Sequence, residues 1–197
     1  MTSPKHARIL LLFAHPAYQR SRINHALIEA VQDIDGLSLH DLYEQYADGF
    51  IDARREQALL QEHEVIVAQH PLYWFSCPPL LRLWQDTVLT NGFAYGQGGT
   101  ALAGKRWLSV VSTGGGTFDD LHCEPERFAV EELLHPFEAA SDLCGMHWEA
   151  PFVVHGGHAL GMEALAQHAA DYRARLLDLR EGLTPPLHAA HDRAAGA

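Results

Sequence analysis

Residues 65–84 read VIVAQHPLYWFSCPPLLRLW, a β-like run and a helix-like run joined by a loop of prolines and aromatic residues. The apolar start predicts a buried strand, and the two tandem prolines suit the first turn of a helix that ends near Val88. Loops are normally polar, so Tyr73, Trp74 and Phe75 in succession after a strand favour a binding role. Ligands of open α/β sheets bind at the carboxyl ends of the strands. We therefore expect this loop to hold a flat ring; the alternative is that its aromatic residues only pack against the next helix.

The rest of the chain alternates between apolar runs and segments of helical periodicity. The runs expected to form strands are 8–14, 37–42, 65–69, 107–112 and 148–155. Helices are expected over 23–34, 52–62, 79–88, 130–144 and 165–179, with a long glycine-rich connection over 91–104. This alternation predicts an α/β protein with a five-stranded parallel sheet in the order 2-1-3-4-5 and helices on both faces. A single domain is expected over 1–183, followed by a loose tail over 184–197.

The composition is that of an ordinary globular protein and argues against several classes. The chain of 197 residues is long enough for one well-buried domain. Its formal net charge of −11 argues against nucleic-acid binding and against attachment to anionic lipid by charge. No apolar run is long enough for direct membrane insertion or a secretory signal, and three cysteines without a Cys-x-x-Cys spacing suggest reduced thiols. A cytoplasmic location is expected.

A second candidate loop begins with residues 14–16 and leads to Ser21, at the start of the next expected helix. The first turn of a helix presents unpaired N–H groups and a positive dipole end, so it can hold a phosphate. Ser21 and Asn24 can add neutral hydrogen bonds, while His15 and Arg22 can add charge. The alternative is that Ser21 only caps the helix, since neither a Gly-x-Gly-x-x-Gly nor a Walker pattern is present.

The third loop begins at Ser112, directly after a predicted buried strand, and contains three consecutive glycines at 114–116. Glycines let the backbone approach a ligand closely and leave space above it for a second planar molecule; the alternative is a flexible turn. In the strand order 2-1-3-4-5 the loops after strands 1, 3 and 4 are neighbours at one edge. Together the three loops make a flavin the expected ring.

Four motifs in this order resemble those of the flavodoxin-like NAD(P)H:quinone oxidoreductases. Within that group the chain is most similar to the ancillary flavoproteins of bacterial glutathione-regulated potassium-efflux systems. The resemblance extends over about residues 8–180. The motifs are 14–16 with Ser21 and Asn24, then 71–74, then 93–96, and then 112–116.

The resemblance implies a non-covalent flavin, with FMN preferred over FAD because no C-terminal extension is present to cover an adenine. It also implies a homodimer in which Tyr95 is a candidate gate at the partner subunit's site. The implied flavin-binding residues are His15, Ser21, Arg22, Ile23 and Asn24 around the phosphate, Pro71, Leu72, Tyr73 and Trp74 beside the ring, and Ser112, Thr113, Gly114 and Gly115 at its other edge.

The activity implied is two-electron transfer, as hydride, from NAD(P)H through the flavin to a quinone. Both substrates would use one place in turn, and no side chain is expected to be catalytic. Two departures from the group stand out: residues 118–122 lack the Tyr that many members carry there, and Tyr73 replaces a common Gln. The alternative function is a regulatory subunit that docks on and activates a potassium-efflux antiporter at the inner membrane.

The 14 histidines do not indicate a metal site. His155 and His158 flank two glycines, and His63 precedes Glu64, but neither arrangement has the spacing of a known zinc site. No metal is therefore expected.

Overall fold

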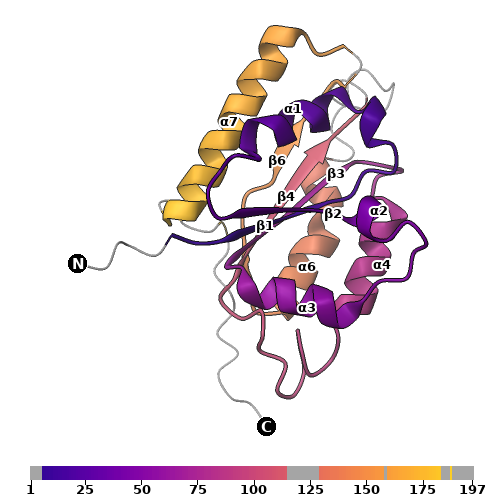
Figure 1. Cartoon of the computed structure of the whole chain (residues 1–197), viewed down its shortest axis with the longest axis vertical. Coiled ribbons are helices and arrows are strands. Elements are labelled where there is room, and N and C mark those ends of the chain that lie inside the picture. The colour runs from indigo at the N-terminus through magenta and orange to yellow at the C-terminus, as the bar shows by residue number, and fades with distance from the viewer. Residues whose placement is uncertain (1–5, 115–128, 158, 183–186, 188–197) are drawn as a thin grey trace.

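The computed structural model describes residues 6–114, 129–157, 159–182 and 187. Their strands form one parallel sheet in the order β2-β1-β3-β4-β5, and β6 also pairs with β4 (Figure 1). The predicted order 2-1-3-4-5 is therefore confirmed. The strands are β1 (Ile9–Phe13), β2 (Leu37–Asp41), β3 (Val65–Pro71), β4 (Arg106–Ser112), β5 (His147–Trp148) and β6 (Phe152–Val154).

Helices cover both faces of this sheet, as predicted (Figure 1). One face carries α1 (Arg22–Val31) and α7 (Met162–Glu181), which lie side by side. The single-turn 3-10 helix η1 (Tyr18–Arg20) precedes α1. The opposite face carries α2 (Leu42–Gln45), α3 (Ala53–Glu62), α4 (Pro79–Val88), α5 (Val130–Leu133) and α6 (His135–Leu143).

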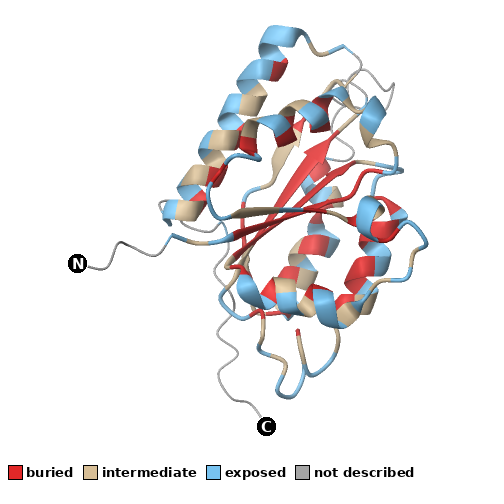
Figure 2. Cartoon of the chain, viewed as in Figure 1, coloured by how far each residue is buried: buried red, intermediate tan, exposed pale blue. Residues whose placement is uncertain are grey.

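The central strands are buried on both sides, which is why they read as continuous apolar runs (Figure 2). Alternate residues of β1 enter different cores. Ile9 and Leu11 pack in the core under α1 and α7, whereas Leu10 and Leu12 pack in the core under α3, α4 and α6. The sheet is thus the shared wall between two apolar layers.

The predicted strand 148–155 is split into β5 and β6. Pro151 has no N–H to donate to the sheet, so the ladder breaks beside it. Just before the break, the fully buried Glu149 carboxylate accepts hydrogen bonds from Arg106 Nε at 2.5 Å and from Arg175 Nη2 at 2.9 Å. This carboxylate therefore joins β4 to the last helix, α7.

The predicted helix 130–144 is likewise two helices, α5 and α6. Pro136 lies in the first turn of α6, where its missing N–H is tolerated, but it prevents α5 from continuing. The last helix is longer than predicted and ends at Gly182, whose φ of 70° is the left-handed conformation that closes many helices. The domain boundary at residue 183 and the loose tail over 184–197 stay predictions, because the structure describes only Leu187 of that stretch.

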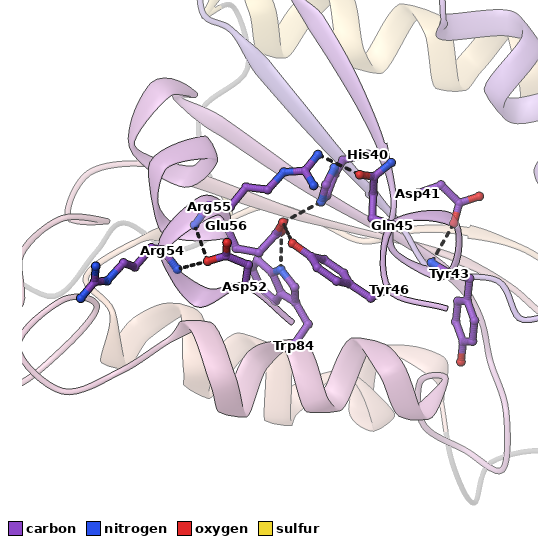
Figure 3. A network of polar contacts seen from close by, with 10 residues as sticks. All are labelled: His40, Asp41, Tyr43, Gln45, Tyr46, Asp52, Arg54, Arg55, Glu56 and Trp84. Carbon is purple, nitrogen blue, oxygen red and sulfur yellow. Dashed lines mark hydrogen bonds and ion pairs between the residues drawn. The ribbon is translucent and has the colours of Figure 1, made fainter. Parts of the chain in front are cut away.

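A buried carboxylate also ties the helices of the second face together (Figure 3). Glu56 of α3 accepts hydrogen bonds from Tyr46 Oη at 2.5 Å and Trp84 Nε1 at 2.7 Å, and its Oε1 lies 2.9 Å from His40 Nε2. Burial alone would raise the pKa of Glu56, but these three partners outweigh burial and lower it. The ionised carboxylate thus joins β2, α3 and α4.

Within the described residues, no helix combines the length and the apolar character needed to span a bilayer. The same residues contain no group of three histidine, cysteine or carboxylate side chains that could hold a metal ion.

His70, near the end of β3, is a titratable group buried in the core. Its ring stacks on Phe137 with centroids 5.5 Å apart, and its Nε2 has no hydrogen-bond partner in the structure. Burial lowers the pKa of His70 to about 4 from an ordinary value of 6.5. The folded protein therefore keeps this ring neutral. As the pH falls, this lowers the free energy of unfolding, because the unfolded chain can bind the proton.

We expect folding stability to decrease as the pH is lowered from about 6.5 to about 4, because only the unfolded chain protonates His70 in that interval. The shift corresponds to about 3 kcal/mol. Urea unfolding at several pH values should show that the free energy of unfolding of His70→Phe falls less over this interval than that of the wild-type protein.

The control is His135→Phe at an exposed histidine of α6, which should keep the decrease. An unchanged pH profile in His70→Phe would contradict the assignment.

Candidate functional site

A cavity of about 700 Å³ opens at the carboxyl edge of the sheet, where β1, β3, β4 and β6 end. Four segments that are distant in the sequence line it together. The lining residues are His15, Ala17, Arg20, Ser21, Arg22 and Ile23 from the first loop and α1, Pro71, Leu72 and Tyr73 from the second loop, Ser112, Thr113 and Gly114 from the third, and Gly157 after β6.

Most of the residues expected around a ligand are therefore brought together, and three are not in the lining. Asn24 is fully buried directly behind the cavity wall. Trp74 lies at the tip of its loop with 94% of its surface exposed, outside the cavity lining. Gly115 lies outside the described residues. Tyr95 lines a different cavity of about 320 Å³ beside α4 and α6, and its role toward a partner subunit stays a prediction.

The first turn of α1 supplies hydrogen-bond donors at one end of the cavity. Ser21 is the N-cap of α1, and its Oγ accepts from Asn24 N at 3.4 Å. The N–H groups of this turn lie at the positive end of the helix dipole, as an anion site requires. Arg22 donates to the Leu160 carbonyl, which ties α1 to the segment after β6. Arg20 adds a second guanidinium to the cavity lining.

His15 contributes a neutral ring rather than the positive charge expected from the sequence. Burial lowers the pKa of His15 and outweighs the opposing effect of a backbone hydrogen bond. Its Nδ1 accepts from Ala17 N at 3.0 Å, which leaves Nε2 to carry the proton. The positive charge at this end of the cavity therefore comes from the arginines and the helix dipole.

The aromatic loop forms a two-residue hairpin at the other end. Tyr73 N–H donates to Ser76 O and Ser76 N–H donates to Tyr73 O, both at 3.0 Å. Trp74 and Phe75 lie between them with φ values of 49° and 60°, the left-handed signs of a type I′ turn. Asn and Gly normally fill these positions, so two large aromatic residues there store strain.

This turn determines which amides of the loop can reach a ligand. Leu72 N–H donates to Ser112 O at 2.8 Å, and Tyr73 N–H is used within the turn. In the described part of the chain, the N–H groups of Trp74 and Phe75 have no acceptor. The loop can therefore offer backbone donors to a ligand at its tip, and not at Leu72 or Tyr73.

Sequence reasoning missed Gly157, Ala17 and Arg20. Gly157 N–H donates to Thr113 O at 2.9 Å, and a Cβ on Gly157 would lie 3.0 Å from that oxygen and 3.6 Å from Gly114 Cα. A side chain at this position would therefore crowd the point where two loops meet at the cavity. The sequence contains a signal for Gly157, because a glycine pair at 156–157 follows the last strand at this same edge. From the sequence alone, this pair was considered only as the spacer of a possible metal site between His155 and His158. His158 lies outside the described residues.

The cavity combines an anion-binding end with an end bordered by aromatic and apolar side chains. Among the described lining residues, Thr113 has a base beside its hydroxyl, with Oγ1 3.3 Å from His155 Nδ1, whereas neither serine is paired with a base in this way. The arrangement can bind and orient a flat, anionic molecule, and it offers little chemistry of its own.

Comparisons with known proteins agree with this fold. The model of a family described as having a flavodoxin-like fold matches residues 7–176. The glutathione-regulated potassium-efflux system ancillary protein KefG of Escherichia coli (strain K12 / DH10B) is 46% identical over 166 residues, which are 84% of this chain and 90% of that protein.

Two solved structures resemble the chain closely. General stress protein 14 from Treponema denticola, in complex with FMN, has a TM-score of 0.80 and 38% identity, covering 87% of this chain and 99% of that one. An NADPH-quinone reductase from P. pentosaceus has a TM-score of 0.76 and 32% identity, covering 85% of this chain and 96% of that one.

We expect the double variant Trp74→Asn with Phe75→Gly to raise the free energy of unfolding by about 1 kcal/mol, because these residues adopt the turn without strain. Trp74 is so exposed that its replacement should remove little buried apolar surface. Urea denaturation at neutral pH measures the difference.

The matched control is Trp74→Ala with Phe75→Ala, which removes both rings but keeps a Cβ at each left-handed position. If the two double variants are equally stable, the turn does not store strain.

Proposed function

The chain belongs to the family with the flavodoxin-like fold, and on that premise we propose that it is an FMN-dependent NAD(P)H:quinone oxidoreductase. One observation carries the proposal: a single cavity joins the first turn of α1 to the loops after β3 and β4. Phosphate and ring would thus be held at opposite ends of one site. The FMN complex and the reductase among the similar structures support it.

The residues present fit FMN. Its phosphate would lie against the N–H groups of Arg22 and Ile23, with Ser21 and Arg20 beside it. Its ring would lie against Pro71, Leu72 and Tyr73 on one side and Ser112, Thr113 and Gly114 on the other. The N–H groups of Trp74 and Phe75, which have no acceptor among the described residues, would donate to heteroatoms of the ring. His15 and Gly115 complete the proposed set, and Asn24 would act from behind the wall through Ser21 and Ser112.

FMN, when bound, supplies the hydride chemistry that the side chains lack. The protein would bind, orient and exclude water. Few side-chain atoms would project beside the ring at Thr113, Gly114 and the nearby Gly157. The space left there could be occupied first by a nicotinamide and then by a quinone. Sharing one place makes the two substrates alternate, and no side chain needs to act as a nucleophile.

Absorbance spectroscopy tests this function. We expect the purified protein to show a flavin spectrum that NADH or NADPH bleaches without oxygen and that a quinone restores. Initial rates at varied concentrations of both substrates should give the parallel double-reciprocal lines of a ping-pong mechanism. An apoprotein that takes up no FMN in excess would rule the proposal out.

A second candidate function is that of a regulatory subunit for a potassium-efflux antiporter. The observation that favours it is the 46% identity to a protein named as ancillary to such a system. In this proposal the protein is cytoplasmic, reaches the inner membrane only through the antiporter, and acts as a homodimer with Tyr95 near the partner subunit's site.

Tyr73→Ala separates the two functions, because it removes an aromatic ring that lines the proposed flavin site. We expect quinone reduction to fall about tenfold or more, as is typical when a group that orients a substrate is lost. The variant is compared with the wild-type protein in cells that express a potassium-efflux antiporter.

If potassium efflux is still activated when turnover has fallen, the regulatory function does not depend on the reductase. If efflux activation falls in proportion to turnover, it depends on the reductase. Leu83→Ala, at an exposed residue of α4, is the control and should change neither measurement.

A further inference from the structure

We propose that Tyr172 of α7 is a positioning residue that fixes the direction of a buried hydrogen-bond chain, so that Ser21 and Ser112 donate to a phosphate in the cavity. The inference rests on the proposed function, because the phosphate is taken to be that of FMN. It assigns a role in ligand selection to a side chain that does not line the cavity.

The chain runs through the wall between the cavity and α7. Tyr172 Oη donates to Gln69 Oε1 at 3.1 Å, and Gln69 Nε2 donates to Asn24 Oδ1 at 3.0 Å. Asn24 Nδ2 then donates to Ser112 Oγ at 2.8 Å and to Ser21 Oγ at 3.0 Å. The tyrosine, the glutamine and the asparagine are all fully buried, so water does not satisfy any of these groups.

The tyrosine hydroxyl decides the direction of the whole chain. In the opposite arrangement, the amide groups of Gln69 and Asn24 would both be reversed, and a nitrogen of Gln69 would face Tyr172. The phenol proton would then lack an acceptor, because in the described part of the chain its Oη has only Gln69 as a partner. A buried donor without an acceptor is costly, so the observed direction is favoured.

This direction turns both serines into donors toward the cavity. Ser21 Oγ accepts from Asn24 Nδ2 and also from Asn24 N at 3.4 Å, which occupies its lone pairs and leaves its proton to point elsewhere. Ser112 Oγ also accepts from Asn24 Nδ2. No acceptor for either hydroxyl proton is present among the described residues, and both serines line the cavity. A phosphate oxygen is the acceptor that this pair is arranged to meet.

The position of Tyr172 is itself held by charged contacts of two residues that follow it in α7. Arg173 donates to the Ala30 carbonyl of α1 and to Asp33 just after that helix, and Arg175 donates to the buried Glu149. Figure 1 shows α7 lying along α1 over the same face of the sheet. The phenol is thus fixed to the scaffold and not to the ligand.

A donor pair of fixed direction should distinguish ligands by their phosphate. FMN and riboflavin share the same ring, but only FMN presents phosphate oxygens, which accept hydrogen bonds and at neutral pH carry little proton to donate. Reversing the chain would turn the serine protons toward Asn24 and remove them from the phosphate. Loss of the phenol should therefore weaken FMN binding and spare riboflavin binding.

The test is Tyr172→Phe, which removes one oxygen atom and keeps the ring in its apolar surroundings. Dissociation constants of the apoprotein for FMN and for riboflavin are measured by quenching of flavin fluorescence. We expect the constant for FMN to rise about tenfold and that for riboflavin to stay within about twofold. Equal weakening of both flavins, or no change for FMN, would overturn the inference.

The matched control is Tyr46→Phe, because Tyr46 is also a buried tyrosine whose hydroxyl donates to a core side chain, here Glu56 (Figure 3). It should lower stability without changing the ratio of the two constants. If Tyr172→Phe fails to fold, Gln69→Met decides, since it removes the donor to Asn24 and should weaken FMN selectively. A wild-type apoprotein that binds neither flavin would refute the proposed function itself.

Discussion

The in-register parallel pairing of β1, β3 and β4 is the constraint on which the rest of the structure depends. β3 and β4 end level with each other, because Pro71 pairs with Ser112, and β1 ends nearby at Phe13, which pairs with Gln69. Backbone hydrogen bonds continue the pairing just past the strands, from Ala14 N to Gln69 O at 3.0 Å. Everything that lines the cavity follows from this common edge.

Two features at that edge, the first turn of α1 and the turn at Trp74 and Phe75, have opposite effects on folding stability. The first turn of α1 is favourable both for folding and for binding, because the cap and the dipole serve the helix and an anion alike. The turn at Trp74 and Phe75 is unfavourable for folding, since aromatic residues occupy left-handed positions. Strain of this kind persists only where the surroundings hold it, and here the hydrogen bonds of Tyr73 and Leu72 do so.

The two faces of the sheet contain different polar anchors. Glu56 joins β2, α3 and α4 on one face, and Glu149 joins β4 to α7 on the other. Both carboxylates are fully buried and surrounded by donors, which is the condition under which a buried charge is tolerated. The second anchor bears on the site, because it helps to hold α7, and with it Tyr172, against the cavity wall.

The sequence by itself determined the strand order, most of the helices and three of the loops that line the cavity. The reason is that apolar periodicity, the cap at Ser21 and the prolines at 78–79 act over a few residues and do not require distant partners. Only the tertiary structure decided that Asn24 lies behind the cavity and not in it, that Gly157 closes the cavity, and that Trp74 points outward. These outcomes depend on hydrogen bonds and packing between residues such as Gln69 and Tyr172, which are far apart in the chain and are joined only when the sheet and α7 come together.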